Sequence, residues 1–198
     1  MTKAPSRSGE HVIDIDTDRS VKTLQLADSR EMVRVAGKSR PVPMFCPIHM
    51  RVINERAKVM IVRFPRRGGK DYTVAAKVVL DRLRGLSPRD CSYVTLDRPR
   101  AGEWIGYVAQ ILKRFGVLLK VVGYTEIIEE SEYFVAEGRM PIPGMDHTVA
   151  IRALSSTVDG VRGRDGDVIL SEFAFHPEPK RLFQAAAPCT QNGGRIIM

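Results

Sequence analysis

A lysine that follows two glycines is the first feature of the sequence that could do chemistry. Gly68, Gly69 and Lys70 lie between an apolar run and a segment with helical spacing. Glycines in such a turn let backbone N–H groups point inward, the following helix start carries partial positive charge, and a lysine reaches the outer phosphates of a nucleotide. The order of strand, glycine turn and helix therefore indicates a phosphate-binding loop.

The match to the full phosphate-loop pattern, G-x-x-x-x-G-K-[ST], is partial. Phe64 occupies the first glycine position, and Asp71 occupies the Ser or Thr position. A short Gly-Gly-Lys run is common by chance, so the loop taken alone is a weak signal.

A carboxylate at the end of a second buried strand is the partner that such a loop needs. The run DVILSEF (167–173) leads an apolar strand into Glu172. In phosphoryl-transfer sites a carboxylate in this place orients the attacking water or helps to hold Mg²⁺. For an isolated strand, a surface glutamate at the strand end is the more common explanation of Glu172.

Composition favours a globular protein with a basic surface. Of the 198 residues 43% are hydrophobic, and 31 Lys and Arg against 23 Asp and Glu give a net charge of +8. This excess favours a polyanionic partner, although a basic protein without a nucleic-acid role fits it as well. No apolar run approaches the roughly 18 residues of a membrane helix, and no signal-peptide core is present. We therefore expect a cytoplasmic protein with no membrane partner.

The cysteines do not form a framework. Cys46, Cys91 and Cys189 are odd in number and widely spaced, which argues against a disulfide scaffold or a zinc site. We expect reduced thiols, two of them buried.

Strands and helices alternate along most of the chain, which predicts a mainly parallel sheet covered on both faces. Residues 1–40 read as a polar N-terminal arm and residues 41–198 as one domain. The apolar face from Trp104 to Phe115 is expected to be core. The expected strands are 58–64, 91–96, 117–122, 147–154, 167–171 and 194–198, and the expected helices are 72–86, 104–115 and 179–187. A strand pair or an irregular β insert is expected at 125–135.

Four blocks of sequence resemble the N-terminal ATPase domain of phage large terminase subunits, in particular the branch found in Mu-like phages. They are PIHMRVINERAKVMIVRFPRRGGKD (47–71), CSYVTLDRPRAGEWIGYVAQIL (91–112), VRGRDGDVILSEFAFHPEP (161–179) and APCTQNGGRIIM (187–198). SEFAFH after RGRDG is the most specific part. The resemblance implies a three-layer αβα P-loop NTPase domain with a mainly parallel sheet, truncated at its C-terminal end, with the family's nuclease domain outside these residues.

The resemblance also implies roles for single residues. Lys70 would bind the β and γ phosphates, and Gly68 and Gly69 would supply backbone donors. Arg67 would also take part in nucleotide binding. His49 falls at the position where the family has a glutamine that recognises adenine.

Two residues are implied in catalysis. Arg66 would sense or stabilise the γ phosphate, for which a planar, permanently charged guanidinium is suited. Glu172 would be the catalytic carboxylate. Arg162 and Arg164 could contact DNA or phosphate, although a solvated loop explains them equally well.

Three positions depart from the family pattern: His49, Asp71 and Ser171. Asp71 replaces the hydroxyl that binds Mg²⁺, and Ser171 replaces the first residue of an Asp-Glu pair. We expect this exchange to keep one carboxylate and one hydroxyl around the metal, since Mg²⁺ takes oxygen ligands. The opposing effect is repulsion between the Asp71 carboxylate and the negative charge of the nucleotide. Two unit charges about 4 Å apart repel by about 4 kcal/mol at an effective dielectric near 20. Impaired ATP turnover is therefore an open alternative.

The resemblance implies an ATP- and Mg²⁺-dependent motor that moves double-stranded DNA into a capsid. The implied partners are a portal protein and a small terminase subunit, in a homo-oligomeric ring. The implied location is the cytoplasm of a bacterial host, transiently at the viral procapsid. Two alternatives remain: another P-loop DNA translocase or helicase, and a degenerate prophage remnant that binds nucleotide or DNA without catalysis.

Overall fold

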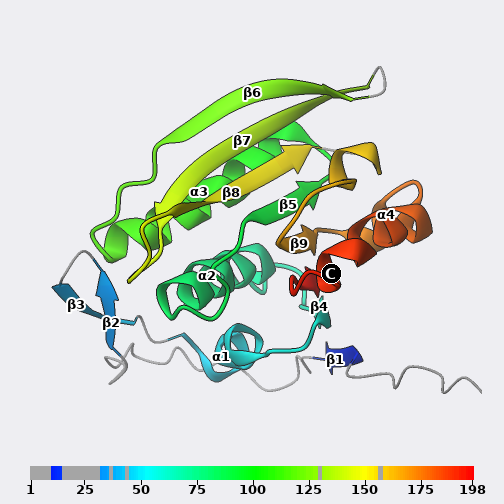
Figure 1. The fold of residues 1–198 in the computed structure, drawn as a ribbon. Coiled ribbons are helices and arrows are strands. Elements are labelled where there is room, and N and C mark those ends of the chain that lie inside the picture. Colours follow the sequence, from blue (N-terminus) through cyan, green and yellow to red (C-terminus); the bar gives the residue numbers. More distant parts are fainter. Residues whose placement is uncertain (1–9, 15–31, 36–37, 43–44, 129–130, 156–157) are drawn as a thin grey trace, which may run out of the picture.

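The structure is a computed structural model that describes residues 10–14, 32–35, 38–42, 45–128, 131–155 and 158–198. An eight-stranded sheet runs through its centre, in the order β1-β4-β10-β9-β5-β8-β7-β6 (Figure 1). The first six strands in this order, β1, β4, β10, β9, β5 and β8, run parallel to one another. β7 pairs antiparallel with β8 on one side and with β6 on the other. Their bounds are β1 Glu10–Asp14, β4 Val59–Arg63, β5 Cys91–Thr95, β6 Val121–Ile128, β7 Ser131–Pro141, β8 Thr148–Ser155, β9 Asp167–Leu170 and β10 Ile196–Ile197.

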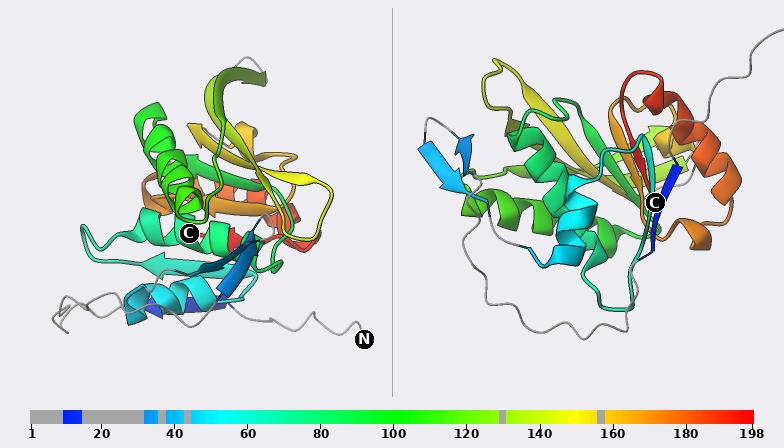
Figure 2. Two further views of the ribbon diagram at one scale, coloured as in Figure 1. Left: turned by 90° about the vertical axis from the view of Figure 1, so that its left-hand side faces the viewer. Right: turned by 90° about the horizontal axis from the view of Figure 1, so that it is seen from below.

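Helices cover both faces of this sheet (Figure 2). Alternate strand residues point to opposite faces. Tyr93 and Ile169 therefore enter the larger core with α1, α2 and α3, whereas Val94 and Leu170 enter a smaller core with α4. The expected three-layer α/β fold with a mainly parallel sheet is confirmed. The helices are α1 Pro47–Asn54, α2 Lys70–Leu83, α3 Arg98–Arg114 and α4 Pro179–Ala186, with 3-10 turns at Asp159–Val161, Phe173–Phe175 and Ala187–Thr190.

The expected elements are present, with shifts at their starts. α2 starts at Lys70 and α3 at Arg98, both earlier than the apolar spacing indicated. Asp97 caps α3 by accepting from the N–H of Arg100, and a proline follows in the first turn. Caps and first-turn prolines start a helix before its apolar face begins. Conversely, β6 starts at Val121, later than expected, and the predicted β insert belongs to a long β6–β7 hairpin.

Most of the predicted polar arm, residues 1–40, lies outside the described residues. Its described pieces are β1, which pairs in parallel with β4, and a hairpin of β2 (Met32–Val35) and β3 (Lys38–Pro41). Val33 and Val42 are buried against the main core.

The expected burial of two cysteines is confirmed. Cys91 and Cys189 are buried and free, and Cys46 is a free thiol of intermediate burial. The predicted apolar face of α3 is core, since Trp104, Ile105 and the later members of its stripe are buried. Among the described helices none has the length and apolar character needed to cross a membrane.

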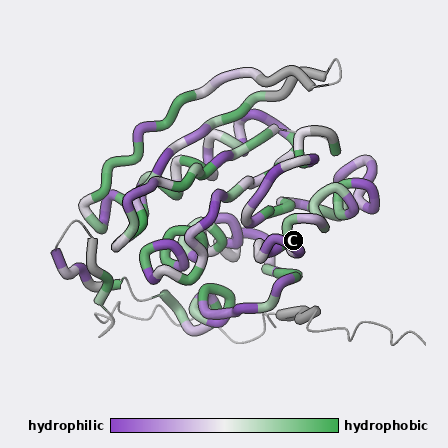
Figure 3. The backbone as a smooth tube through the Cα atoms, in the orientation of Figure 1, coloured by the Kyte–Doolittle hydropathy of each residue, from purple (hydrophilic) through white to green (hydrophobic). Residues whose placement is uncertain are grey.

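α2 is buried on all sides from Thr73 to Leu83, although it carries charged residues. In Figure 3 its tube changes between hydrophobic and hydrophilic stretches. The helix runs back along the parallel strands, so its carboxyl half lies at the strands' amino ends. There Lys77, Asp81 and Arg82 are at most 1% exposed.

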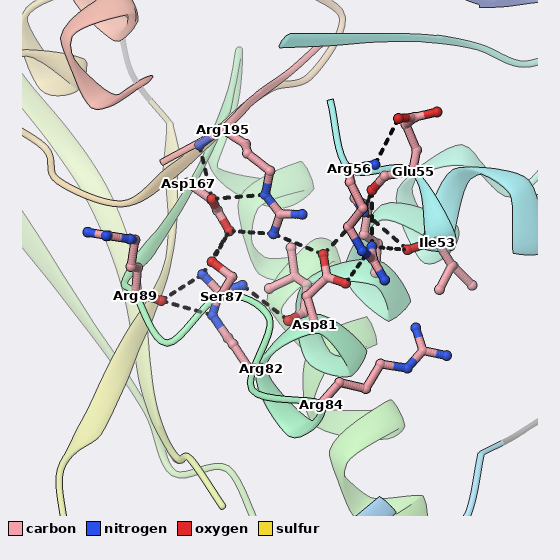
Figure 4. Close-up of polar contacts among 12 residues, drawn as sticks. Ile53, Glu55, Arg56, Asp81, Arg82, Arg84, Ser87, Arg89, Asp167 and Arg195 are labelled. Carbon is pink, nitrogen blue, oxygen red and sulfur yellow. Dashed lines mark hydrogen bonds and ion pairs between the residues drawn. The ribbon is translucent and has the colours of Figure 1, made fainter. Parts of the chain in front are cut away.

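A buried ion network holds this half of α2 in place (Figure 4). Asp81 lies 3.1 Å from Lys77 Nζ, 2.9 Å from Arg195 Nη2 and 3.0 Å from Arg56 Nη1. Lys77 also donates to the carbonyls of Ile53, at 3.1 Å, and Glu55, at 2.6 Å, at the end of α1. The network thus ties α2 to α1 and to the residue before β10.

A second carboxylate extends the network to the start of β9. Asp167 accepts from Ser87 Oγ at 2.8 Å and from the backbone N–H of Arg195 at 3.0 Å. It also pairs with Arg82, at 3.3 Å, and with Arg195, at 3.2 Å. Burial alone would raise the pKa of Asp167, but these two guanidinium groups lower it below its ordinary value. Asp167 is therefore an anion that joins α2 to β9 and β10.

Candidate functional site

The glycine loop joins the end of β4 to the start of α2. Arg67 and Gly69 have positive φ angles of 64° and 75°, so the chain turns sharply just before the helix. Gly69 lacks the Cβ that disfavours this conformation. The N–H of Gly68 donates to the carbonyl of Pro65 at 2.9 Å, which closes the turn. A phosphate that binds to Gly68 must therefore replace this hydrogen bond.

Lys70 is the first residue of α2, directly after its N-cap, Gly69. The first N–H groups of a helix have no partner within the helix, and the helix dipole adds partial positive charge there. The side chain of Lys70 is 28% exposed, and its Nζ lies 3.9 Å from Asp71 Oδ1. This arrangement of donors and ammonium suits an anion.

Two positions that sequence reasoning singled out as exchanged, Asp71 and Ser171, lie in contact. Ser171 directly follows β9, and its Oγ donates to Asp71 Oδ1 at 3.4 Å. The hydroxyl of Tyr93, on β5, donates to the same oxygen at 3.2 Å. One carboxylate and two hydroxyl groups from three segments thus converge at the carboxyl ends of the strands.

Ser171 itself is fixed on both sides of its peptide. Its N–H donates to the carbonyl of Val94 at 2.9 Å, and its carbonyl accepts from His176 Nε2 at 3.1 Å. Because a carbonyl only accepts, Nε2 of His176 carries the hydrogen. Burial lowers the pKa of His176. A neutral, buried histidine therefore holds the strand end that carries Ser171 and Glu172.

Glu172 follows in a left-handed conformation, with φ 53°. Such a conformation in a residue other than glycine costs of order 1 kcal/mol and is concentrated at functional sites. The Glu172 carboxylate pairs with Arg100 in the first turn of α3, and Arg100 Nε lies 3.2 Å from Asp97. Glu172 is 35% exposed and Arg100 45% exposed, so this pair is open to solvent.

The predicted residues fall into two groups. Lys70, Asp71, Ser171 and Glu172 lie at one edge of the sheet and are linked by the contacts above or by sequence adjacency. Arg66 and Arg67 are exposed on the glycine loop beside them. In a separate segment, Arg162 and Arg164 follow the 3-10 turn at Asp159–Val161, and Arg164 donates to the carbonyl of Gly160 at 3.1 Å.

His49 lies against the glycine loop. Its Nε2 donates to the carbonyl of Gly68 at 3.0 Å, and its ring packs on Phe64, with centroids 5.6 Å apart. In this position His49 supports the loop from α1. Adenine recognition by this residue stays a prediction.

The residues present fit Mg²⁺ in one specific way. All contacts that the described residues make with the Asp71 carboxylate fall on Oδ1, and the side chain is 43% exposed. No group of three or more His, Cys, Asp or Glu side chains suited to a metal occurs among the described residues. Mg²⁺ is commonly held by one or two carboxylates together with substrate phosphates. Asp71 and Ser171 therefore fit a metal that arrives with a nucleotide.

Three residues of this edge had no signal in the sequence: Tyr93, Arg100 and His176. Tyr93 lies in an apolar strand and reads as core, and Arg100 lies in a charged run. His176 is part of the SEFAFH segment, but only the fold shows that its ring turns back to Ser171. Hydrophobic pattern and spacing do not report such contacts between distant segments.

Comparison with known proteins gives one sequence relative and two similar structures. No family model matches the chain. It is 27% identical over 174 residues to "Probable terminase, large subunit gp28" of Escherichia phage Mu, a match that covers 84% of this chain and 31% of that protein. The chain thus spans about a third of the length of this relative.

Among solved structures, the ATPase domain of the Thermus phage P74-26 large terminase aligns with a TM-score of 0.48 and 16% identity, covering 75% of this chain and 62% of that chain. A point mutant of the same domain aligns with a TM-score of 0.47 and 14% identity over the same shares. The sequence relative comes from the branch of phages that the four blocks indicated. In sequence, the chain therefore resembles part of a phage large terminase subunit, the family that the four blocks indicated.

Proposed function

We propose that this chain is the ATP-binding motor domain of a DNA-packaging terminase, which hydrolyses ATP to move double-stranded DNA into a capsid. The supporting observation is the convergence of Lys70, Asp71, Ser171 and Glu172, from two distant segments, at the carboxyl edge of a parallel sheet. Ligands of open α/β sheets bind at this edge. The sequence similarity to the probable terminase large subunit of phage Mu supports the choice of motor.

In the proposed site each residue has a distinct task. Lys70 and the N–H groups around Gly69 bind the outer phosphates, and Asp71 and Ser171 hold Mg²⁺. When bound, Mg²⁺ neutralises negative charge on the phosphates. Glu172 orients the attacking water once its carboxylate leaves Arg100.

Arg66, Arg67 and His49 have supporting roles in the proposed site. Arg66 and Arg67 lie on the loop where guanidinium groups can reach the γ phosphate. His49 braces the loop, which keeps the backbone donors in place. The further partners are a portal protein, a small terminase subunit and other copies of the chain in a ring, in the bacterial cytoplasm and at the procapsid.

Glu172→Gln tests the catalytic assignment. The variant keeps the size of the side chain and removes its ability to accept a proton, so ATP hydrolysis falls by about 100-fold or more. The thermal stabilisation by Mg·ATP is retained, because a ligand that binds only the folded state raises the melting temperature whether or not it turns over. Glu178→Gln, at an exposed carboxylate paired with Arg181, is the matched control and leaves hydrolysis unchanged.

A second candidate is a nucleotide-binding domain without turnover, and Asp71 is the observation in its favour. Its carboxylate lies 3.9 Å from the ammonium of Lys70 and weakens the attraction of that cation for phosphate. Stabilisation by Mg·ATP without hydrolysis would support this candidate.

The exchange of groups can be reversed to separate the two. Asp71→Ser/Ser171→Asp returns the hydroxyl to the helix and the carboxylate to the strand. If the original arrangement is impaired, the double variant gains hydrolysis; if it is a working exchange, the double variant stays within a few-fold of the original, and each single variant loses activity. Stimulation by duplex DNA without any effect of a portal protein would instead favour another DNA translocase.

A further inference from the structure

The side chain of Tyr93 lies in the core below the proposed site, and its hydroxyl group contacts the site at Asp71. Its ring is 2% exposed and stacks on Trp104, with centroids 4.3 Å apart and an interplanar angle of 8°. The stack leaves the ring little freedom, and only its hydroxyl reaches the strand edge. A buried tyrosine hydroxyl ordinarily has a hydrogen-bond partner, and here the partner is a carboxylate, Asp71.

The direction of this hydrogen bond follows from the two groups. A carboxylate oxygen has no hydrogen and only accepts, so the phenol O–H of Tyr93 donates to Asp71 Oδ1. A neutral phenol is a poor ligand for Mg²⁺ but a good donor to a carboxylate that binds it.

We propose that Tyr93 is a positioning residue that holds Oδ1 of Asp71 and so leaves Oδ2 for the metal. The proposal rests on the proposed nucleotide site. Both hydroxyl groups that reach the carboxylate, Tyr93 and Ser171, donate to Oδ1, and the described residues give Oδ2 neither a hydrogen bond nor an ion pair. Lys70, at 3.9 Å, is also on the Oδ1 side.

Asp71 stands on the first turn of α2, and its side chain is 43% exposed, so little packing restrains its carboxylate. A donor that is itself held by its stack on Trp104 restricts the rotation of this carboxylate. Positioning groups of this kind commonly change metal affinity by 10- to 100-fold.

Tyr93→Phe tests the proposal, because phenylalanine keeps the stack on Trp104 and removes only the hydroxyl. The measurement is the Mg²⁺ concentration that gives half of the thermal stabilisation by a fixed concentration of ADP, so no turnover is needed. We expect this concentration to rise about 10-fold, in line with the loss of one hydrogen bond to a charged group. The stabilisation by ADP in EDTA is expected to stay the same.

Tyr107→Phe is the matched control, because this tyrosine also donates to a carboxylate, that of Glu103 on its own helix. It leaves the Mg²⁺ concentration unchanged. In an Asp71→Ala background the effect of Tyr93→Phe disappears, since groups that act through one another are not additive. An effect that persists there would assign Tyr93 a purely structural role.

The outcomes separate this proposal from the proposed function. Absence of any ADP stabilisation in the unaltered protein overturns the nucleotide site and the role of Tyr93 with it. Mg²⁺-dependent stabilisation that Tyr93→Phe leaves unchanged overturns the positioning role alone. A rise of equal size in Tyr107→Phe likewise overturns it, because the change is then not specific to the site.

Discussion

The two ends of the parallel strands both gather charged side chains, but they hold them differently. At the amino ends Asp81 and Asp167 are at most 1% exposed, and each has several cationic or hydroxyl partners. At the carboxyl ends Asp71 and Glu172 are 43% and 35% exposed, with fewer and longer or solvent-open contacts. The first arrangement fixes a helix, and the second leaves charge available to a ligand.

α2 connects the two ends, which explains why both are needed. Its carboxyl half is locked by the ion network, and its first turn carries Lys70 and Asp71. A helix that is fixed at one end holds the groups at its other end in a constant place relative to β9. We therefore expect substitutions at the amino ends of the parallel strands to lower the stability of the fold. Substitutions at the carboxyl ends of the strands are expected to change nucleotide binding.

The largest expected effect on stability is that of Asp81→Asn. The change leaves Lys77 and Arg195 as buried cations without their shared anion, which costs about 3–5 kcal/mol of unfolding free energy. Denaturant unfolding of the variant and the original protein measures this difference. Asp97→Asn, at an exposed carboxylate that caps α3, is the control; it stays within about 0.5 kcal/mol, since asparagine also caps helices. A loss below about 1 kcal/mol for Asp81→Asn would show that the network is not what fixes α2.

The next effect is a dependence of stability on pH through Lys77. Burial lowers the pKa of this amine to about 8, although Asp81 opposes the shift, and its ordinary value is 10.5. Between pH 8 and 10.5 the unfolded chain binds more protons, so the contribution of Lys77 to stability rises with pH in this window and is smallest below pH 8.

The measurement for Lys77 is the difference in unfolding free energy between the original protein and Lys77→Met. We expect this difference to increase in favour of the original protein by about 2 kcal/mol from pH 8 to 10 and to stay level from pH 6 to 7. Burial raises the pKa of Cys91 and of Cys189 to about 12, which lowers stability at high pH in both proteins and cancels in the difference. A flat difference across pH 8 to 10 would mean that Lys77 keeps an ordinary pKa.

The smallest expected effect on stability is that of Arg100→Gln. Its pair with Glu172 is open to solvent, and such pairs contribute about 0–1 kcal/mol. The same change frees the Glu172 carboxylate from its ion pair. We therefore expect the ATP concentration that gives half-maximal hydrolysis to change, while the stability of the fold stays nearly the same. Thermal unfolding together with steady-state kinetics measures both. A large loss of stability would remove the contrast between the two ends of the strands.

Much of the fold could be predicted from the sequence because its strands are short apolar runs and its helices have apolar stripes. The strand that carries Asp167 and the helix stripe from Trp104 are such cases. Apolar spacing places the start of α3 too late, because Asp97 and the proline in the first turn begin the helix before its apolar stripe. The β6–β7 hairpin was expected as a strand pair or an irregular insert over 125–135, and the strand pair is what the structure shows.

The candidate site was predictable in part. Lys70, Asp71, Ser171 and Glu172 stand next to recognisable strands and a glycine loop, and their approach follows from a parallel sheet. The contacts that hold them do not follow, because Tyr93 and the ion network act between segments that no short-range pattern relates. Lys77 and Asp81 are the exception, since their spacing of four residues on a helix already indicates an ion pair.

The most direct test of the account is a crystal structure of the chain with Mg²⁺ and a non-hydrolysable ATP analogue. The account predicts that the analogue's terminal phosphate lies within hydrogen-bond distance of Lys70 Nζ. It also predicts that the metal contacts Asp71 Oδ2 and that the Glu172 carboxylate faces the same phosphate. An analogue bound elsewhere, or bound at the loop with Glu172 turned away from the phosphate and no metal at Asp71, would contradict it.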